Sequence, residues 1–439
     1  MSNRKKLVFL VFLSIISCIH INAQENGTYG AYSPYSIFGI GDISKEGTAY
    51  NKSMGGVGLA SRNKRFINYL NPAAIAVRDS CSFMADFGLQ QQNKVYRQND
   101  IRSGSNTFNI YDFVMSFPIY RSSALVVGIC PFSDLGYDIK LKETDPDIIG
   151  NTGNITYDTY GEGSVYQLFL GAGATFWKRF SVGANLIYYF GNIDKVYNVN
   201  YANQSHGSIN SGYDLQVRGV TGKFGLQYQQ PLGKDLALVF GATYRLGTKM
   251  KGRTIYYENK VTSSVVDTLV YNEMKNGRDN KIRIGDEVGV GVSLRQGDKW
   301  SVEFNYIRSH WKGTGIDKYE GYGINGVSDF SATASQSFRA GFEVVPNRND
   351  IRYYMRTCAY RAGVYYDQAY YKLDGNKVNS VGITLGMTFP VFRWYNGISI
   401  GVDFGQRGSL RGNMVRERYV NFVVGFNIFD IWFQRPRYN

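Results

Sequence analysis

Apolar and polar residues alternate along this chain in short segments, and the segments come in pairs joined by short turns. From Trp300 to Tyr306 every second residue is aromatic or aliphatic, and the residues between them are Ser301, Glu303 and Asn305. Successive side chains of a strand point to opposite faces of its sheet. A period of two therefore predicts strands with one apolar face and one polar or small face.

Fourteen segments carry this pattern, and the connections between them alternate between short turns and long segments. The long connections are 134–162, 193–215, 249–283 and 311–335. This alternation is typical of up-and-down barrels of the outer membrane, which have short periplasmic turns and long outer loops. An even strand number closes the sheet and leaves no unpaired edge in lipid. The predicted strands are 81–91, 107–119, 123–133, 163–176, 179–192, 216–229, 235–248, 284–295, 299–310, 336–345, 357–367, 380–390, 396–405 and 420–432.

The sequence thus predicts an all-β fold, a transmembrane antiparallel up-and-down β-barrel of about 14 strands over residues 81–433. The composition agrees, with 50 Gly, 35 Tyr and 27 Phe in 439 residues. This aromatic content excludes a disordered chain. Beyond the N-terminus there is no apolar run long enough for a membrane helix. Alternation alone does not decide whether the apolar face is inside or outside, but aromatic strand ends and an export signal favour an apolar exterior.

The N-terminus predicts export. Residues 1–24 read as a signal peptide, with basic residues at 4–6, an apolar stretch at 7–19 and a small-residue exit at Ala23. Cys18 has two interpretations, a lipid-attachment cysteine or an ordinary apolar residue, and the following Ala-Gln exit favours the second. Together with a barrel, this predicts the outer membrane of a Gram-negative bacterium.

Residues 25–80 precede the first predicted strand and are too long for a simple tail. A barrel of fourteen strands is wider than the eight-stranded kind that side chains alone can fill, so we expect this segment to form an N-terminal plug, or hatch, in the lumen. Its glycines suit turns or close backbone approach. The Asn-Pro pair either lines a gate or forms a turn that seats the plug. The plug or gate candidates are Gly55, Gly56, Gly58, Asn71, Pro72 and Ala73.

The polar faces of the predicted strands supply a second set of candidates. Residues on these faces would point into the lumen of an outer-membrane barrel. Their polarity favours a filled lumen over an apolar one. The lumen-facing candidates are Asn185, Tyr189, Glu303, Asn305, Asp403 and Asn427.

Several stretches of the chain also resemble a known family. The run Gly55–Ala60 followed by Leu70–Ala73 looks like the plug of the FadL/TodX-type long-chain fatty acid and hydrocarbon transport barrels, and residues 30–439 are similar to their Bacteroidota branch. The resemblance implies a fourteen-stranded barrel with an N-terminal hatch. The chain ends in a short basic tail, 434–439, instead of the terminal aromatic residue usual in such barrels. The other similar stretches are Tyr35–Asp42, Pro131–Tyr137, Ser181–Asn185, Tyr360–Tyr366, Gly382–Gly386, Gly405–Gly408 and Asn427–Phe433.

The sequence offers little support for catalysis. The mature chain has only His206 and His310, and Ser309 beside His310 points to the opposite strand face, which does not suit a catalytic triad. There is no paired-histidine metal spacing and no phosphate-binding loop. We therefore expect no enzyme, no cofactor and no metal site. The mature cysteines, Cys81, Cys130 and Cys358, are odd in number and are expected to be buried apolar residues.

The net charge of +14 comes from 49 Lys and Arg against 35 Asp and Glu. Basic residues recur near turns and loop bases, as at Arg121, Lys178, Arg245 and Lys249, where we expect them to attract outer-membrane lipid and lipopolysaccharide head groups and not nucleic acid.

Two functions remain open, and the lumen separates them. The first is passive uptake of hydrophobic small molecules such as long-chain fatty acids, which requires a continuous apolar cavity reaching the plug. The alternative is a non-transport barrel subunit of a larger outer-membrane complex, in protein secretion or outer-membrane protein assembly, with other outer-membrane or periplasmic proteins as partners. That role predicts a lumen filled by polar and aromatic side chains. Uptake is favoured by family analogy.

Overall fold

The computed structural model describes residues 31–78, 82–120, 122–203, 207–262, 265–276, 282–319, 321–322, 329–391, 396–412 and 414–431. The predicted signal peptide with Cys18, and also Cys81, His206 and the basic tail 434–439, lie outside the described residues.

Fourteen long strands form a closed antiparallel barrel, so the predicted fold class is confirmed. Each strand pairs with the next along the chain, and the last strand pairs with the first from Ser82↔Ile431 to Arg97↔Arg416. Closure pairs every strand on both sides, as lipid requires. The strands are β2 (Ser82–Gln98), β3 (Ile101–Tyr120), β4 (Ser123–Lys142), β5 (Ile155–Phe176), β6 (Phe180–Tyr201), β7 (Ser208–Pro231), β8 (Leu236–Arg245), β13 (Asp286–Gln296), β14 (Trp300–His310), β16 (Ser335–Val344), β17 (Ala359–Leu373), β18 (Asn376–Pro390), β19 (Gly397–Arg407) and β20 (Arg416–Ile431).

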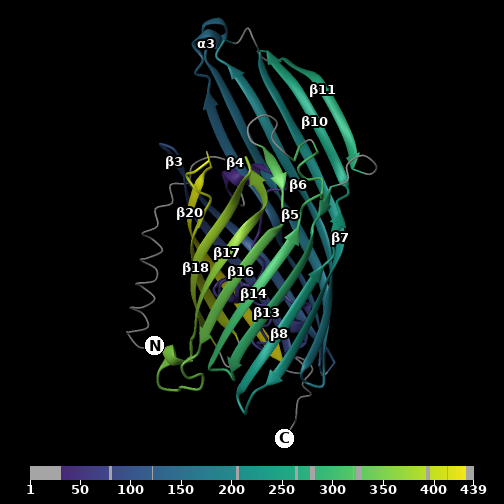
Figure 1. Cartoon of the computed structure of the whole chain (residues 1–439), viewed down its shortest axis with the longest axis vertical. Coiled ribbons are helices and arrows are strands. Elements are labelled where there is room, and N and C mark those ends of the chain that lie inside the picture. The colour runs from purple at the N-terminus through teal and green to yellow at the C-terminus, as the bar shows by residue number, and fades with distance from the viewer. Residues whose placement is uncertain are drawn as a thin grey trace.

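The long connections are more ordered than the sequence predicted. Strands β4 to β7 continue into the segments 134–162 and 193–215, and a short helix, α3 (Pro146–Thr152), joins β4 to β5. Segment 249–283, predicted as a loop, contains the hairpin β10 (Gly252–Thr262) and β11 (Val265–Asn276), and β10 pairs with β7. Together these strands form a sheet extension that rises above the rest of the barrel (Figure 1).

The strands of the sheet extension were predicted as loops because one face of the extension carries a row of polar residues. Asp158, Asn198, Asn210 and Asn259 stand opposite one another on β5, β6, β7 and β10. These partly buried polar residues stand where apolar ones would be in the barrel, so the apolar half of the alternation is lost.

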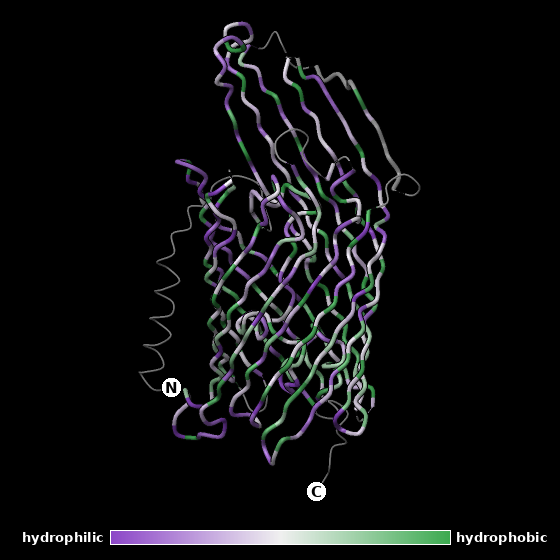
Figure 2. The backbone as a smooth tube through the Cα atoms, viewed as in Figure 1, coloured by the Kyte–Doolittle hydropathy of each residue, from purple (hydrophilic) through white to green (hydrophobic). Residues whose placement is uncertain are grey.

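The outer wall of the barrel proper is apolar. Leu168, Leu170, Leu186, Phe304 and Ile383 are all large and exposed on the strands, and each alternates with buried residues on the inner face. Figure 2 shows the hydrophobic and hydrophilic residues alternating along these strands. This is the arrangement of a lipid-facing barrel. Among the described residues, no helix combines the length and the apolarity needed to cross a membrane.

Residues 31–78, here called the N-terminal segment, contact strands on different sides of the barrel (Figure 1). Backbone amides donate to the carbonyl oxygen of Gly136 on β4, to Thr384 Oγ1 on β18 and to Glu303 Oε1 on β14. Most residues of the segment are buried. Its short elements are η1 (Pro34–Ile37), β1 (Asp42–Ile43), α2 (Ala49–Lys52) and η2 (Pro72–Ala76).

Glycines on the inner wall let the segment approach the strands closely. A Cβ atom on Gly183 of β6 would lie 2.3 Å from the backbone of Pro72, and one on Gly363 of β17 would lie 2.2 Å from the Gly55 nitrogen. No other residue fits at such distances without moving backbone. Many inner-wall glycines therefore serve contact with the segment.

The largest buried cluster joins the N-terminal segment to the upper part of the barrel. It includes Tyr35 and Ile40 of the segment with Phe132, Tyr189 and Trp311. Two of the three mature cysteines are described, and both, Cys130 and Cys358, are buried and free, as expected. The remaining short elements are β9 (Thr248–Lys249), β12 (Arg283–Ile284), β15 (Phe330–Ala332) and α4 (Tyr354–Thr357).

Candidate functional site

A cavity of about 320 Å³ lies between the N-terminal segment and the inner wall, and its lining is charged. Seven basic and seven acidic side chains border it. Pockets for apolar ligands are lined mainly by hydrophobic and aromatic side chains with few polar groups. Ion pairs face this cavity, and apolar or aromatic side chains such as Leu59, Phe132 and Tyr370 make up much of the rest of its lining.

Three consecutive contacts tie the segment to the wall. Asp42 Oδ2 lies 2.7 Å from Arg407 Nη1, and Lys45 Nζ lies 3.3 Å from an Asp403 carboxylate oxygen. Glu46 pairs with Lys223 at 3.2 Å. Arg407 and Asp403 are on β19, whereas Lys223 is on β7, so the pairs link the segment to two separate strands.

The environment shifts the pKa values of charged groups on the segment. Burial alone would raise the pKa of the Glu46 carboxyl, but Lys223 and Arg245 lower it to about 2. Burial lowers the pKa of Lys52 to about 8, although its ammonium lies 3.8 Å from the Tyr111 ring centroid. Glu46 is thus ionised at neutral pH, whereas Lys52 loses its proton at a pH just above neutral.

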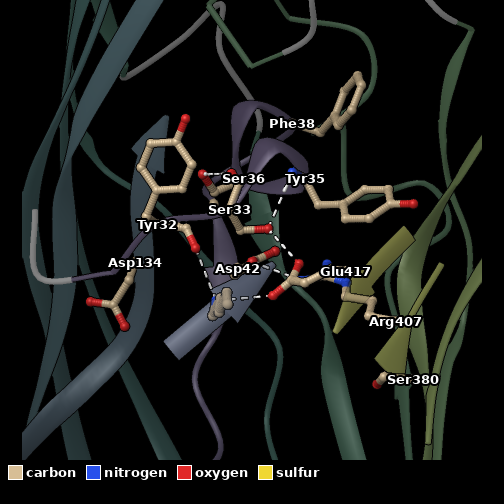
Figure 3. Close-up of polar contacts among 12 residues, drawn as sticks. Tyr32, Ser33, Tyr35, Ser36, Phe38, Asp42, Asp134, Ser380, Arg407 and Glu417 are labelled. Carbon is tan, nitrogen blue, oxygen red and sulfur yellow. Dashed lines mark hydrogen bonds and ion pairs between the residues drawn. The ribbon is translucent and has the colours of Figure 1, made fainter. Parts of the chain in front are cut away.

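A second polar cluster spans the seam between the first and last strands (Figure 3). Lys94 Nζ on β2 lies 3.1 Å from Glu417 Oε1 on β20 and donates to the Tyr32 carbonyl at 3.0 Å. Ser33 Oγ donates to the other carboxylate oxygen of Glu417 at 3.0 Å. The start of the N-terminal segment is therefore bonded to both strands that close the barrel.

The glycine candidates lie in one tight turn of the segment against the wall. Gly55 and Gly56 have φ of +72° and +76°, where glycine is favoured. The Gly56 carbonyl accepts from Arg339 Nη1 at 3.1 Å. Gly58 has no space for a side chain, because a Cβ would meet Asn51 at 2.6 Å and Leu70 at 2.7 Å.

The Asn-Pro candidates form the buried start of η2. Asn71 is fully buried, and its Oδ1 accepts from the Ala73 amide at 3.0 Å, which caps the helix. Its Nδ2 donates to the carbonyl oxygens of Leu59 and Leu226. Pro72 is the first residue of η2 and Ala73 is also fully buried. The geometry is that of a seated turn, which is one of the two predicted interpretations.

The lumen-facing candidates all lie on the inner face, but in different surroundings. Glu303 accepts from the Ala60 amide at 2.8 Å, Asp403 binds Lys45, and Asn427 Nδ2 donates to the Arg65 carbonyl at 2.8 Å. The remaining three, Asn185, Tyr189 and Asn305, are no more than 5% exposed. Three candidates thus bind the N-terminal segment directly.

The prediction for one basic residue was wrong. Arg245 was expected at a rim near lipid head groups, but it is 3% exposed and points inward, where it pairs with Glu287 at 3.3 Å. The strand parity explains this, since its neighbours Tyr244 and Leu246 are exposed on the outer face. The sequence analysis also missed Asp42, Lys45 and Glu46, because that part of the chain has no periodicity.

The histidine that lies within the described part of the chain has a simple environment. His310 Nδ1 lies 3.2 Å from Asp286 Oδ2 in an exposed pair, whereas Ser309 Oγ donates to Glu287. Within the described residues, no group of three His, Cys, Asp or Glu side chains is placed to hold a metal.

Comparison with known proteins gives one family and one fold. The model of the BamG family matches residues 4–439. No curated protein matches the chain. Among solved structures, the toluene transporter TbuX of Ralstonia pickettii is 15% identical, with 87% of this chain and 98% of that chain covered and a TM-score of 0.59.

Two further structures are similar in the same way. The toluene transporter TodX of Pseudomonas putida is 15% identical over 89% of this chain and 99% of that chain, with a TM-score of 0.57. A FadL homologue of Pseudomonas aeruginosa is 12% identical over 90% of this chain and 100% of that chain, with a TM-score of 0.54. The resemblance to FadL/TodX-type barrels is thereby confirmed for the fold, while the Bacteroidota branch stays a prediction.

Proposed function

Because this chain belongs to the BamG family, we propose that it acts as a non-transport barrel subunit of a larger complex in a Gram-negative outer membrane. The observation that carries the proposal is the lumen. It holds the N-terminal segment and a cavity bordered by seven basic and seven acidic side chains. Charged groups and a chain segment inside the barrel are what a subunit role predicts, and they support the proposal.

The energetics of the lumen support this role. An apolar molecule gains about 0.8 kcal/mol for each CH₂ group that leaves water for apolar surroundings. Next to ion pairs such as Asp42–Arg407 the molecule would instead desolvate charges, which is unfavourable. The charged part of this wall therefore disfavours an apolar cargo.

The contacts of the N-terminal segment support the prediction that residues 25–80 form a plug, and we propose that this plug stays in place. Its ion pairs reach β7 and β19, and its backbone is bonded to β4, β14 and β18. The ion pairs are partly buried, with side chains 6–35% exposed. Displacing the whole segment would require breaking several at once.

The sheet extension supports a role among other proteins. Strands β4 to β7, β10 and β11 project beyond the barrel (Figure 1). They present the polar row described above, from Asp158 to Asn259. We propose that this face contacts protein partners engaged in protein secretion or outer-membrane protein assembly.

Passive uptake of a hydrophobic small molecule, such as a long-chain fatty acid, is the second candidate. It is favoured by the fold shared with the TbuX and TodX toluene transporters. On this proposal the segment 31–78 would have to move, and Gly55, Gly56, Gly58 and Asn71–Ala73 would form its gate.

Native purification from the outer membrane separates the two candidates. The barrel is extracted in mild detergent, and co-purifying proteins and lipids are identified by mass spectrometry. We expect stoichiometric protein partners and no bound apolar molecule. A monomeric barrel carrying a fatty acid or hydrocarbon would overturn the subunit proposal and support uptake.

A further inference from the structure

A small enclosed cavity of about 20 Å³ lies at the short-turn end of the barrel, and three arginines border it. Arg62 belongs to the N-terminal segment, Arg295 to the end of β13, and Arg348 to the connection between β16 and β17. Three chain segments far apart in sequence therefore bring guanidinium groups to one place.

Arg62 is buried, and among the described residues no carboxylate forms an ion pair with it. It is 5% exposed, and Nη1 donates to Ser181 Oγ at 2.7 Å, while Nε is buried with no hydrogen-bond acceptor. Burial, and then the nearby charge of Arg295, lower the pKa of Arg62 to about 10. A buried donor without an acceptor is costly, so this geometry is suited to an anion.

Arg348 is only partly buried. Its Nε is buried and has no acceptor, and within the described residues it makes no ion pair. An ordered loop holds it in place, since the Asn347 amide donates to the Arg356 carbonyl at 2.9 Å and Asp350 Oδ1 accepts from the amides of Arg352 and Tyr353.

The acidic side chains that border the cavity are engaged elsewhere. Asp298 pairs with Arg65 at 2.8 Å and with Arg295 at 3.6 Å. Glu343 pairs with Arg361 at 2.7 Å, and Glu303 accepts from the Ala60 amide. None of the three forms an ion pair with Arg62 or Arg348 in the described part of the chain, so these two guanidinium groups stay unpaired although the lining holds three acidic and three basic side chains.

We propose that this cavity is a binding site for a carboxylate group, held by Arg62 and Arg348. One water molecule needs about 10–15 Å³ of such space, so the cavity admits only a small group. The planar carboxylate matches the donor fork of a guanidinium. Its source is either a free small carboxylate or the end of a peptide chain. The proposal does not depend on the proposed function.

Acetate is the probe for the test. The full chain, purified in detergent micelles, is titrated with ¹³C-labelled acetate, and binding is followed by NMR line broadening and by calorimetry. Saturable binding is expected, weakened about tenfold or more in Arg62→Gln and in Arg348→Gln, because each loses a charge-assisted hydrogen bond. Arg352→Gln is the matched control, since Arg352 lies in the same loop and is exposed, and it should bind acetate like the parent.

Competition identifies the source of the carboxylate. Triglycine with a free C-terminus should displace acetate if the site takes chain ends, whereas C-terminally amidated triglycine should not. Displacement by neither peptide would assign the site to free small carboxylates. The proposal is overturned if the parent shows no saturable acetate binding, or if Arg348→Gln, a loop variant that leaves the barrel strands untouched, binds acetate as the parent does.

Discussion

The Arg361–Glu343 pair should contribute more to stability than any exposed charge on this protein. Arg361 Nε lies 2.7 Å from Glu343 Oε2, and the two residues are 3% and 7% exposed. The guanidinium also lies 4.4 Å from the Tyr50 ring and 5.0 Å from the Phe66 ring, both in the N-terminal segment. Removing one partner of a buried pair costs about 3–5 kcal/mol. Glu343→Gln keeps an acceptor, so we expect a loss near 3 kcal/mol.

The assay is equilibrium urea unfolding in lipid vesicles, followed by tryptophan fluorescence. Glu162→Gln, which changes an exposed acid on β5, is the control and should shift the free energy of unfolding by less than about 0.5 kcal/mol. Glu343→Leu combined with Arg361→Met should cost less than the sum of the single changes, because no charge remains buried. The reasoning would be refuted if Glu343→Gln lost less than about 1 kcal/mol of unfolding free energy. It would also be refuted if the double variant lost as much as the two single variants added together.

Three further predictions concern the segment and the wall. Gly183→Val places side-chain atoms where a Cβ already lies 2.3 Å from Pro72, so residues 31–78 should become protease-sensitive in the folded barrel; unchanged protection would contradict the close contact. The pKa of Glu46 in the folded protein is about 2, below its ordinary 4.5. The unfolded chain therefore binds the proton first as pH falls, and folding stability is lost between about pH 4.5 and pH 2. Unfolding midpoints measured against pH should show this loss in the parent and less of it in Glu46→Gln. Leu170→Arg, on the lipid-facing side of β5, should cost about 2–4 kcal/mol in vesicle unfolding, and a neutral result would mean that this face does not meet lipid.

The barrel was predictable because lipid acts on one side of every strand. It forces apolar residues such as Leu168, Leu170 and Leu186 onto alternate positions, and the fourteen predicted segments follow from that constraint. The constraint ends where the sheet leaves the membrane. The β10–β11 hairpin and the upper parts of β4 to β7 therefore have no such signature, and the sequence analysis read them as loops.

The candidate site was predictable only in part, for a related reason. The alternation of side chains along a strand predicts that Glu303 and Asp403 lie on the inner face, but it does not predict what they contact. Their partners come from the N-terminal segment, namely Lys45 for Asp403 and the Ala60 amide for Glu303, and no local pattern connects positions so far apart. The same applies to Arg62 and Arg348, which meet only in the folded barrel.

The seam between β2 and β20 gives the filled lumen a consequence for assembly. It joins the strands that are farthest apart in the sequence, so its loop-closure entropy is the greatest and it forms late. A barrel that closed around an empty interior would enclose Lys223 and Arg407 without Glu46 and Asp42. Closure around the segment instead forms the Glu46–Lys223 and Asp42–Arg407 pairs as the wall is completed. A barrel that closes around its own first residues therefore gains these contacts when its last strand pairs with its first, so the segment can serve as an internal template for the wall.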